Sequence, residues 1–268
     1  MELIGSWNEF LEYRANLFGH LADVAKKCWH HEYIIGNYCE KYGDTYCRAG
    51  GSKSKVFQLK DKRMFYGAVR KMPKEPFLHL YMAAAKYLPG EVGRYASELG
   101  FKDYKSTRVP YKWYRYNAFA CCSENNHIEF DFFYLLFGNE KRIYSTIIHE
   151  LCHTVHHNHK LEFWELLERK LKEAALVEQD YDGWIILKWN KQLLVKEKGY
   201  RLPWKWAPCG CMACESVEVY LSQYWDEFNQ IVRPALRKII RKKLQECEAE
   251  GLIKEYARLY GVDYMGLF

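Results

Sequence analysis

The segment TIIHELCHTVHHNH, residues 146–159, contains five of the ten histidines of the chain, and all five lie between His149 and His159. His149 and His153 are four positions apart, so on an α-helix their imidazoles stand on one face, one turn apart. Two imidazoles in this arrangement can bind the same Zn²⁺ ion. Glu150 is turned by about 100° from His149, so its carboxylate can reach a water on the metal without becoming a ligand. The segment therefore predicts a metal-binding helix of the HExxH type.

The third ligand has to come from beyond this helix. A catalytic zinc site usually has three protein ligands and a water. His156 would lie about 10.5 Å along the helix axis from His149, and three side chains in one line cannot surround an ion tetrahedrally. We expect the helix to end at Asn158, because asparagine tolerates the left-handed conformation found at helix C-termini. The chain can then turn and bring His159 to the metal. The predicted centre is thus Zn²⁺ bound by His149, His153 and His159.

Other residues in and beyond this segment have alternative interpretations. His156 and His157 are expected to be polar neighbours, with a role in orienting substrate or an oxyanion as the alternative. Glu215 and Glu218 are rival third ligands, because some zinc hydrolases use a glutamate downstream of the two histidines. The segment CGCMACES places three thiols within six residues, as Cys209, Cys211 and Cys214. These thiols are expected to be loop and core residues, since a structural zinc needs four ligands and the fourth is not evident. A metal-binding or redox role is the alternative.

The composition excludes several classes of protein. The chain has 268 residues, of which 49% are hydrophobic and 17% aromatic, so it can bury a core and is not a disordered chain. Its formal charge of +6 permits nucleic-acid contact without predicting it. No signal-like N-terminal segment and no apolar run of about 18 residues is present, so no membrane span is expected. Ten cysteines are then typical of thiols or metal ligands, and the expected location is the cytoplasm.

The hydrophobic patterns predict an α+β fold in which helices dominate. Ser6 and Glu9 form a capping box ahead of an amphipathic helix. Residues 42–76 are basic and contain glycine, which is typical of a loop or a short hairpin. Residues 76–100 predict two helices that are separated by a break at Pro89-Gly90.

A small sheet is expected directly before the metal helix. Residues 108–122 and 127–137 are rich in aromatic and β-branched side chains, which favours strands. Further helices are predicted after the metal helix, over residues 161–176, over 184–198, and in the last fifty residues.

The segment HELCHTVHHNHKLEFWELLE, residues 149–168, resembles the signature of the YgjP-like metal-dependent hydrolases, which are relatives of the WLM and SprT minimal zincins. That signature, HELxHxxxxNHxxxFW, is filled here by His149, Glu150, Leu151, His153, Asn158, His159, Phe163 and Trp164. Upstream, the family has a Trp-Gly-Ser-Cys turn where this chain has Phe119-Ala120-Cys121-Cys122. Only the cysteine is kept, so the turn can differ in shape. The resemblance covers roughly residues 77–175.

The resemblance implies a zincin-like fold, in which the edge strand of a small mixed sheet lines a cleft above the HExxH helix. The segment HIEFDFF, residues 127–133, alternates as such an edge strand would, and an extended peptide could pair with it. A half-buried core strand is the alternative. The expected division of the chain is an N-terminal helical and basic region at 1–75, a metallopeptidase core at 76–178 and a C-terminal helical region at 179–268.

The expected activity is that of a zinc-dependent hydrolase, more specifically a metallopeptidase acting on a peptide or protein substrate. Zinc lowers the pKa of its bound water to about 7, and Glu150 takes the proton of that water and returns it to the leaving amine. Two alternatives stay open. The same chemistry could hydrolyse a nucleotide or another phosphoanhydride, or the chain could be an inactive zinc-binding interaction module.

Nucleic acid is the partner that the WLM and SprT relatives suggest, since they act on nucleic-acid-bound protein. The candidate surface here is the predicted helix at 233–243, which carries six basic side chains in eleven positions. Basic helices usually only solvate a surface, and the net charge is small, so dependence on nucleic acid is not expected.

Overall fold

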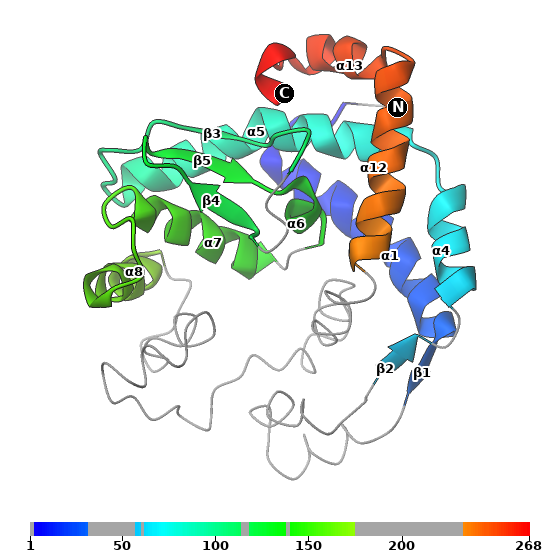
Figure 1. Ribbon diagram of the computed structural model, residues 1–268, viewed down its shortest axis with the longest axis horizontal. Coiled ribbons are helices and arrows are strands. Elements are labelled where there is room, and N and C mark those ends of the chain that lie inside the picture. The colour runs from blue at the N-terminus through cyan, green and yellow to red at the C-terminus, as the bar shows by residue number, and fades with distance from the viewer. Residues whose placement is uncertain (1–2, 32–56, 60–61, 114–117, 138–139, 175–232) are drawn as a thin grey trace. The chain divides into compact units, whose positions relative to one another are not determined.

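Figure 1 shows the computed structural model, which describes residues 3–31, 57–59, 62–113, 118–137, 140–174 and 233–268. Helices dominate these residues, and they accompany one three-stranded and one two-stranded sheet. The predicted α+β class with N- and C-terminal helices is therefore confirmed. The predicted helix at 184–198 lies outside the described residues. None of the described helices is long and apolar enough to span a bilayer.

The chain divides into two compact units, residues 1–82 with 204–261 and residues 83–203 with 262–268. We call them unit 1 and unit 2. The division predicted from sequence, at 1–75, 76–178 and 179–268, stays a prediction.

Unit 1 consists of helices and one pair of short strands. Its elements are α1 (Trp7–Cys28), β1 (Trp29–His31), β2 (Phe57–Leu59), α4 (Lys62–Lys71), α12 (Arg233–Ala249) and α13 (Leu252–Tyr260), with β1 antiparallel to β2. The predicted capping box starts α1, since the amide of Glu9 donates to the Ser6 hydroxyl at 3.1 Å. The Glu9 carboxylate accepts from the amide of Gly5 at 2.8 Å. The helices α12 and α13 confirm the predicted helical C-terminal segment for residues 233–260, whereas residues 219–232 lie outside the described residues.

Helix α5 (Glu75–Glu98) is continuous, so the predicted break at Pro89-Gly90 is wrong. Proline removes one backbone hydrogen bond from a helix and crowds the preceding turn. Leu88 and Val92, on either side of Pro89, are both fully buried. Burial of the apolar face of α5 therefore outweighs the local preference for a break.

Unit 2 contains a mixed sheet of three short strands. These are β3 (Ser106–Arg108), β4 (Ala120–Cys122) and β5 (His127–Phe130). Strand β5 lies in the middle, parallel to β3 and antiparallel to β4, with Ile128 opposite Thr107 on one side and Cys122 on the other. The interpretation of residues 127–133 as an edge strand is therefore wrong. The alternative is correct, because Ile128 is fully buried in the centre of the sheet.

The strand β5 is also shorter than the pattern of residues 127–137 predicts. The chain leaves the sheet at Asp131 and enters α6 (Phe132–Phe137). The Asp131 carboxylate accepts a hydrogen bond from the amide of Phe133 at 3.2 Å. An aspartate in this position caps the start of a helix, which explains why the apolar run after it coils instead of extending the strand.

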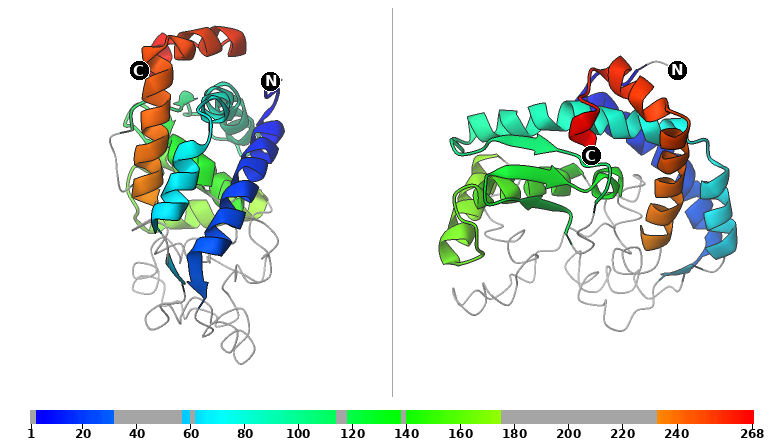
Figure 2. Two further views of the ribbon diagram at one scale, coloured as in Figure 1. Left: turned by 90° about the vertical axis from the view of Figure 1, so that its right-hand side faces the viewer. Right: turned by 45° about the horizontal axis from the view of Figure 1, so that its top comes forward.

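Two helices follow, α7 (Glu140–His153) and α8 (Leu161–Glu173), and the two contact each other. Helix α7 also contacts β4, and its face toward the core is apolar, with Ile143, Ile147 and Leu151 fully buried. Figure 2 shows both helices with the sheet from two further directions. The predicted metal helix is thus a core element of unit 2.

The last seven residues of the chain belong to unit 2 as well. They contain the short helix η4 (Met265–Leu267). The carbonyl of Leu267 accepts a hydrogen bond from the amide of Tyr111 at 2.7 Å, and the rings of Tyr111 and Phe268 lie 5.1 Å apart. The C-terminus therefore returns to the segment that follows β3.

Candidate metal centre

Helix α7 carries His149 and His153 one turn apart, as the sequence predicts, but it ends at His153 and not at Asn158. Beyond it, the amide of Thr154 donates to the Leu151 carbonyl at 3.0 Å, and the Thr154 hydroxyl donates to the same carbonyl at 2.6 Å. A threonine hydroxyl that competes for a carbonyl of the last turn favours a helix end. The chain leaves the helix axis directly after the second histidine.

Asn158 does not act as the predicted left-handed stop residue. Asn126 is the one non-glycine residue with a positive φ among the described residues, so Asn158 is not in the left-handed conformation. The Asn158 side chain instead accepts a hydrogen bond from the amide of Lys160 at 3.1 Å. Such a bond stabilises a turn, and this turn contains His159 and lies directly before the start of α8 at Leu161. Asn158 thus shapes the connection that follows α7.

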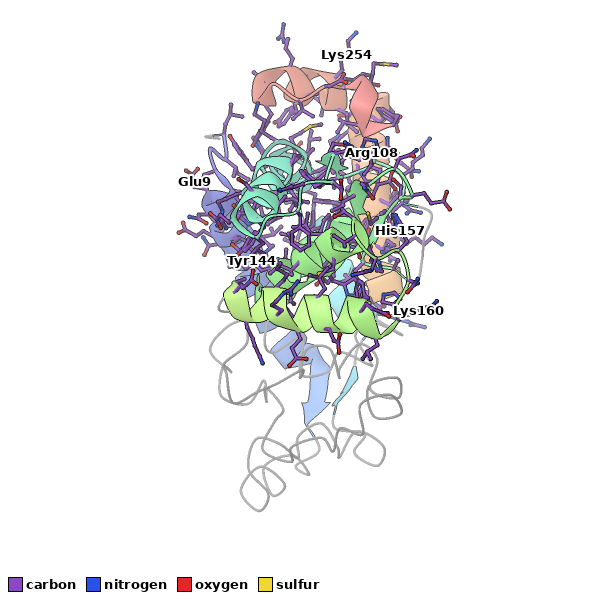
Figure 3. All side chains as sticks on the ribbon, turned by 90° about the vertical axis from the view of Figure 1, so that its left-hand side faces the viewer. Glu9, Arg108, Tyr144, His157, Lys160 and Lys254 are labelled. Atoms are coloured by element: carbon purple, nitrogen blue, oxygen red, sulfur yellow. The ribbon has the colours of Figure 1, made fainter. Side chains whose placement is uncertain are left out.

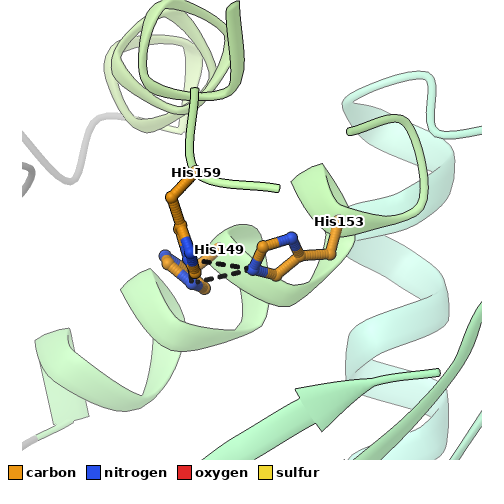
Figure 4. Close-up of side chains that lie close together, drawn as sticks. All are labelled: His149, His153 and His159. Atoms are coloured by element: carbon orange, nitrogen blue, oxygen red, sulfur yellow. Dashed lines mark hydrogen bonds between the residues drawn. The ribbon is translucent and has the colours of Figure 1, made fainter. Parts of the chain in front are cut away.

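The structure brings the three predicted ligands together (Figure 4). The Nε2 atoms of His149 and His153 are 3.2 Å apart, those of His153 and His159 are 3.1 Å apart, and those of His149 and His159 are 3.2 Å apart. The three atoms form a nearly equilateral triangle. Three nitrogens bound tetrahedrally to zinc at 2.0–2.1 Å are separated by about 3.3–3.4 Å. The triangle therefore has nearly the size that one ion requires.

Hydrogen bonding alone does not account for this triangle. In a neutral imidazole each ring nitrogen is either a donor or an acceptor. Three atoms that all contact one another cannot alternate between the two roles, so at least one contact joins two donors or two acceptors. A cation placed against three lone pairs removes this conflict. The chemistry of the donor set therefore fits a metal.

The tautomer of His153 follows from its second nitrogen. Its Nδ1 is 2.9 Å from the carbonyl oxygen of His156, and a carbonyl only accepts, so Nδ1 carries the proton. In the neutral ring Nε2 then presents a lone pair to the centre of the triangle. A metal-binding histidine commonly has its other nitrogen held in this way by a carbonyl.

Burial keeps the three imidazoles in the neutral form that binds metals. It lowers the pKa of His149 well below 6.5, with the neighbouring His153 and His159 acting in the same direction. It lowers the pKa of His153 to about 4, against the effect of the hydrogen bond to His156. Burial also lowers the pKa of His159. His159 is nevertheless an exposed residue, so the triangle is reachable from solvent, as a catalytic site requires.

Glu150, the predicted base, is buried, with 6% of its surface exposed. It lies on α7, which contacts β4. Burial, together with the nearby charge of Glu150, raises the pKa of the Cys122 thiol to about 12. The side of α7 that carries Glu150 is therefore covered by the strand that ends in Cys122. The sequence pattern does not point to Cys122 as part of the site, although Cys122 is the residue that this chain shares with the family turn.

The neighbouring histidines take different positions. His156 is half-buried and contributes its backbone carbonyl, as described above. His157, which Figure 3 labels, is exposed in the connection between α7 and α8. Neither side chain is part of the triangle. Cys152 is fully buried, as a core residue. The rival ligands Glu215 and Glu218, and the thiols of Cys209, Cys211 and Cys214, lie outside the described residues.

An HExxH helix that forms a three-histidine site beside a small mixed sheet is typical of metal-dependent hydrolases. Residues 70–180 match the model of the YgjP-like metallopeptidase domain, which supports the resemblance of this part of the chain to the YgjP-like family. The matched range is close to the range 77–175 over which the sequence resembles that family. A comparison with curated proteins and with solved structures found no match.

Proposed function

We propose that the chain is a zinc-dependent peptidase in which His149, His153 and His159 hold the metal and Glu150 moves the proton. The observation that supports this most directly is the triangle of Nε2 atoms at 3.1–3.2 Å. A zinc ion held there would supply a Lewis acid that lowers the pKa of water and polarises a carbonyl.

The role of Glu150 follows from its position and chemistry. It directly follows one of the three histidines on α7 and does not belong to the triangle. A carboxylate in this place can accept the proton of the attacking water and give it to the leaving amine. Both transfers use the same oxygen atoms, so one residue serves as base and then as acid.

We place the substrate beside β4. In the three-stranded sheet, β4 and β3 form the edges, and β4 contacts α7. An extended peptide can add to such an edge through main-chain hydrogen bonds. Only every second residue of an added antiparallel strand directs its amide toward the sheet. N-methylation of single amides along a cleaved peptide should therefore raise KM at alternate positions, whereas equal effects at every position would contradict this placement.

The replacement Glu150→Gln tests the catalytic role. It preserves the size of the side chain and leaves the zinc content unchanged, but it removes the base, so kcat should fall by roughly 10²–10⁴. The matched control is Glu162→Gln, which makes the same chemical change at an exposed position of α8. Activity should be measured on peptide and on nucleotide panels. Cleavage of nucleotides alone would favour the phosphoanhydride hydrolase, and equal inactivity of wild type and Glu150→Gln on both panels would favour an interaction module.

The replacement His153→Ala tests the metal site. Wild-type protein purified without chelator should carry about one zinc per chain, and the variant should lose most of it because two ligands remain. His157→Ala is the control, since it removes an exposed histidine outside the triangle. Unchanged zinc in Glu215→Ala and Glu218→Ala would exclude the rival ligands. Metal analysis that finds full zinc in His153→Ala would show that the assigned site is wrong.

A further inference from the structure

Phe163 contacts all three imidazoles of the metal centre. Its ring centroid lies 4.9 Å from that of His149, 4.4 Å from that of His153 and 4.8 Å from that of His159. It stacks on His153 at an interplanar angle of 26° and meets the other two rings edge to face, at 72° and 78°. The ring of Phe163 is therefore in contact with all three imidazoles at once, with one through stacking and with two through edge-to-face packing.

Phe163 is buried where the segments that carry the three histidines meet. It lies in the first turn of α8, four residues after His159, and it is fully buried. Helix α8 packs against α7, so the ring connects the helix that carries two of the ligands with the segment that carries the third. The interior around a buried ring is close-packed, and this limits rotation of the imidazoles that contact it.

The geometry points to Phe163 as a positioning residue of the metal centre. We infer that its ring holds the imidazoles of His149, His153 and His159 at the angles at which their Nε2 atoms converge. An aliphatic side chain of similar volume can fill the space, but it offers no flat face for His153 and no ring for the edges of the other two. The inference rests on the proposed three-histidine metal site, and it does not depend on which substrate is cleaved.

The effect on metal binding should be substantial. Side chains that orient metal ligands without touching the metal commonly change metal affinity by about 10–100-fold when they are replaced. Phe163→Leu should therefore raise the zinc dissociation constant by about tenfold or more. With cobalt(II) in place of zinc, the visible d–d absorption should also shift, since it reports the arrangement of the ligands around the metal.

Leu171→Ala is the matched control. Leu171 is fully buried on the same helix, about 12 Å farther along its axis, so the substitution destabilises the core without reaching the imidazoles. Zinc affinity should be measured by competition with a chromophoric chelator in the full chain, and folding by circular dichroism. Should Phe163→Leu fail to fold, Phe163→Met serves as a second variant, because methionine is also an aliphatic side chain without a ring.

The outcomes separate the inference from the metal site on which it rests. Weakened zinc binding and an altered cobalt spectrum in the Phe163 variants, with both unchanged in Leu171→Ala, would support the positioning role. Wild-type affinity and spectrum in a folded Phe163 variant would overturn it, even when His153→Ala loses its zinc. Zinc retained in His153→Ala would instead show that the metal site is assigned to the wrong residues.

Discussion

His153 is the best-defined member of the triangle, because both of its ring nitrogens have an assigned role. The Nδ1 atom donates to the His156 carbonyl and the Nε2 atom faces the other two imidazoles. A second proton on this ring would occupy Nε2, the nitrogen that faces the other two imidazoles, and would place a charge in a buried position. Protonation of His153 should therefore disturb the metal centre and the fold of the metal-free protein together.

The metal-free chain should lose stability as the pH falls below about 6.5. In the folded state the pKa of His153 is lowered to about 4, and that of His149 is lowered as well. Between pH 6.5 and pH 4 the unfolded state therefore binds more protons than the folded state, so the free energy of unfolding decreases as pH falls. Above the pKa of the unfolded state, these histidines are neutral in both states and do not change the free energy of unfolding with pH. Urea unfolding of the metal-free protein at about pH 7 and about pH 4.5 measures the change.

His153→Gln is the comparison for this experiment, because glutamine does not titrate. Acidic groups elsewhere in the chain contribute equally to both proteins, so the difference between them reports the titration of His153 together with its effect on the pKa of His149. The variant should lose less stability than the wild type over the same range of pH. An identical loss in both would show that His153 does not titrate with a lowered pKa in the folded state.

Helix α12 shows why a basic pattern is a weak predictor of nucleic-acid binding. Lys243 is largely buried, and its ammonium group donates to the carbonyls of Arg70 and Met72 at the end of α4. Cations near the last carbonyls stabilise a helix C-terminus. Arg237 is also buried. Two of the six basic side chains that the sequence groups together are thus enclosed within unit 1.

Proteolysis should therefore not depend on DNA. Each phosphate contact would give a slope of about −0.7 to −0.9 in a plot of log affinity against log salt, and we expect no such steep dependence. This salt dependence is obtained by measuring the affinity for single- and double-stranded DNA at low and at physiological salt. Lys238→Glu and Lys242→Glu, at exposed positions of α12, should leave proteolysis with and without DNA unchanged. Tight salt-sensitive binding together with DNA-stimulated cleavage would contradict the prediction.

Across the whole chain, unit 2 is built from two separated parts of the sequence. Its last seven residues follow α13, which belongs to unit 1. Leu267 is 3% exposed, whereas Met265, two positions earlier, is 77% exposed. The terminal segment is therefore anchored through Leu267 and through its carbonyl bond to Tyr111.

Leu267→Ala should destabilise unit 2 by about 2 kcal/mol or more, the cost of removing buried methyl groups from a packed site. Met265→Ala, at the exposed position, should change the free energy of unfolding by no more than about 0.5 kcal/mol. Hydrogen exchange at the Tyr111 amide reports this region directly and should accelerate only in the Leu267 variant. Equal exchange rates in both variants would mean that the C-terminal segment is not anchored through Leu267.

Local geometry explains what the sequence predicts well. The spacing of His149 and His153 puts both on one helix face at 3.6 residues per turn, and the tetrahedral preference of zinc then requires a ligand from beyond the helix, which led to His159. The amphipathic periods that indicate α1, α8 and α12 are equally local. These features depend on residues within a few turns of one another, so their geometry can be derived before the fold is known.

Contacts between distant residues account for what the sequence did not predict. The central place of β5 depends on pairing with β3 and β4, and the unbroken path of α5 through Pro89 depends on the burial of its apolar face. The role inferred for Phe163 requires α8 to pack against α7, and the place of Leu267 requires the C-terminus to return to Tyr111. Strand order and burial arise from long-range packing, in which many weak contacts outweigh a local preference, and no short segment encodes them.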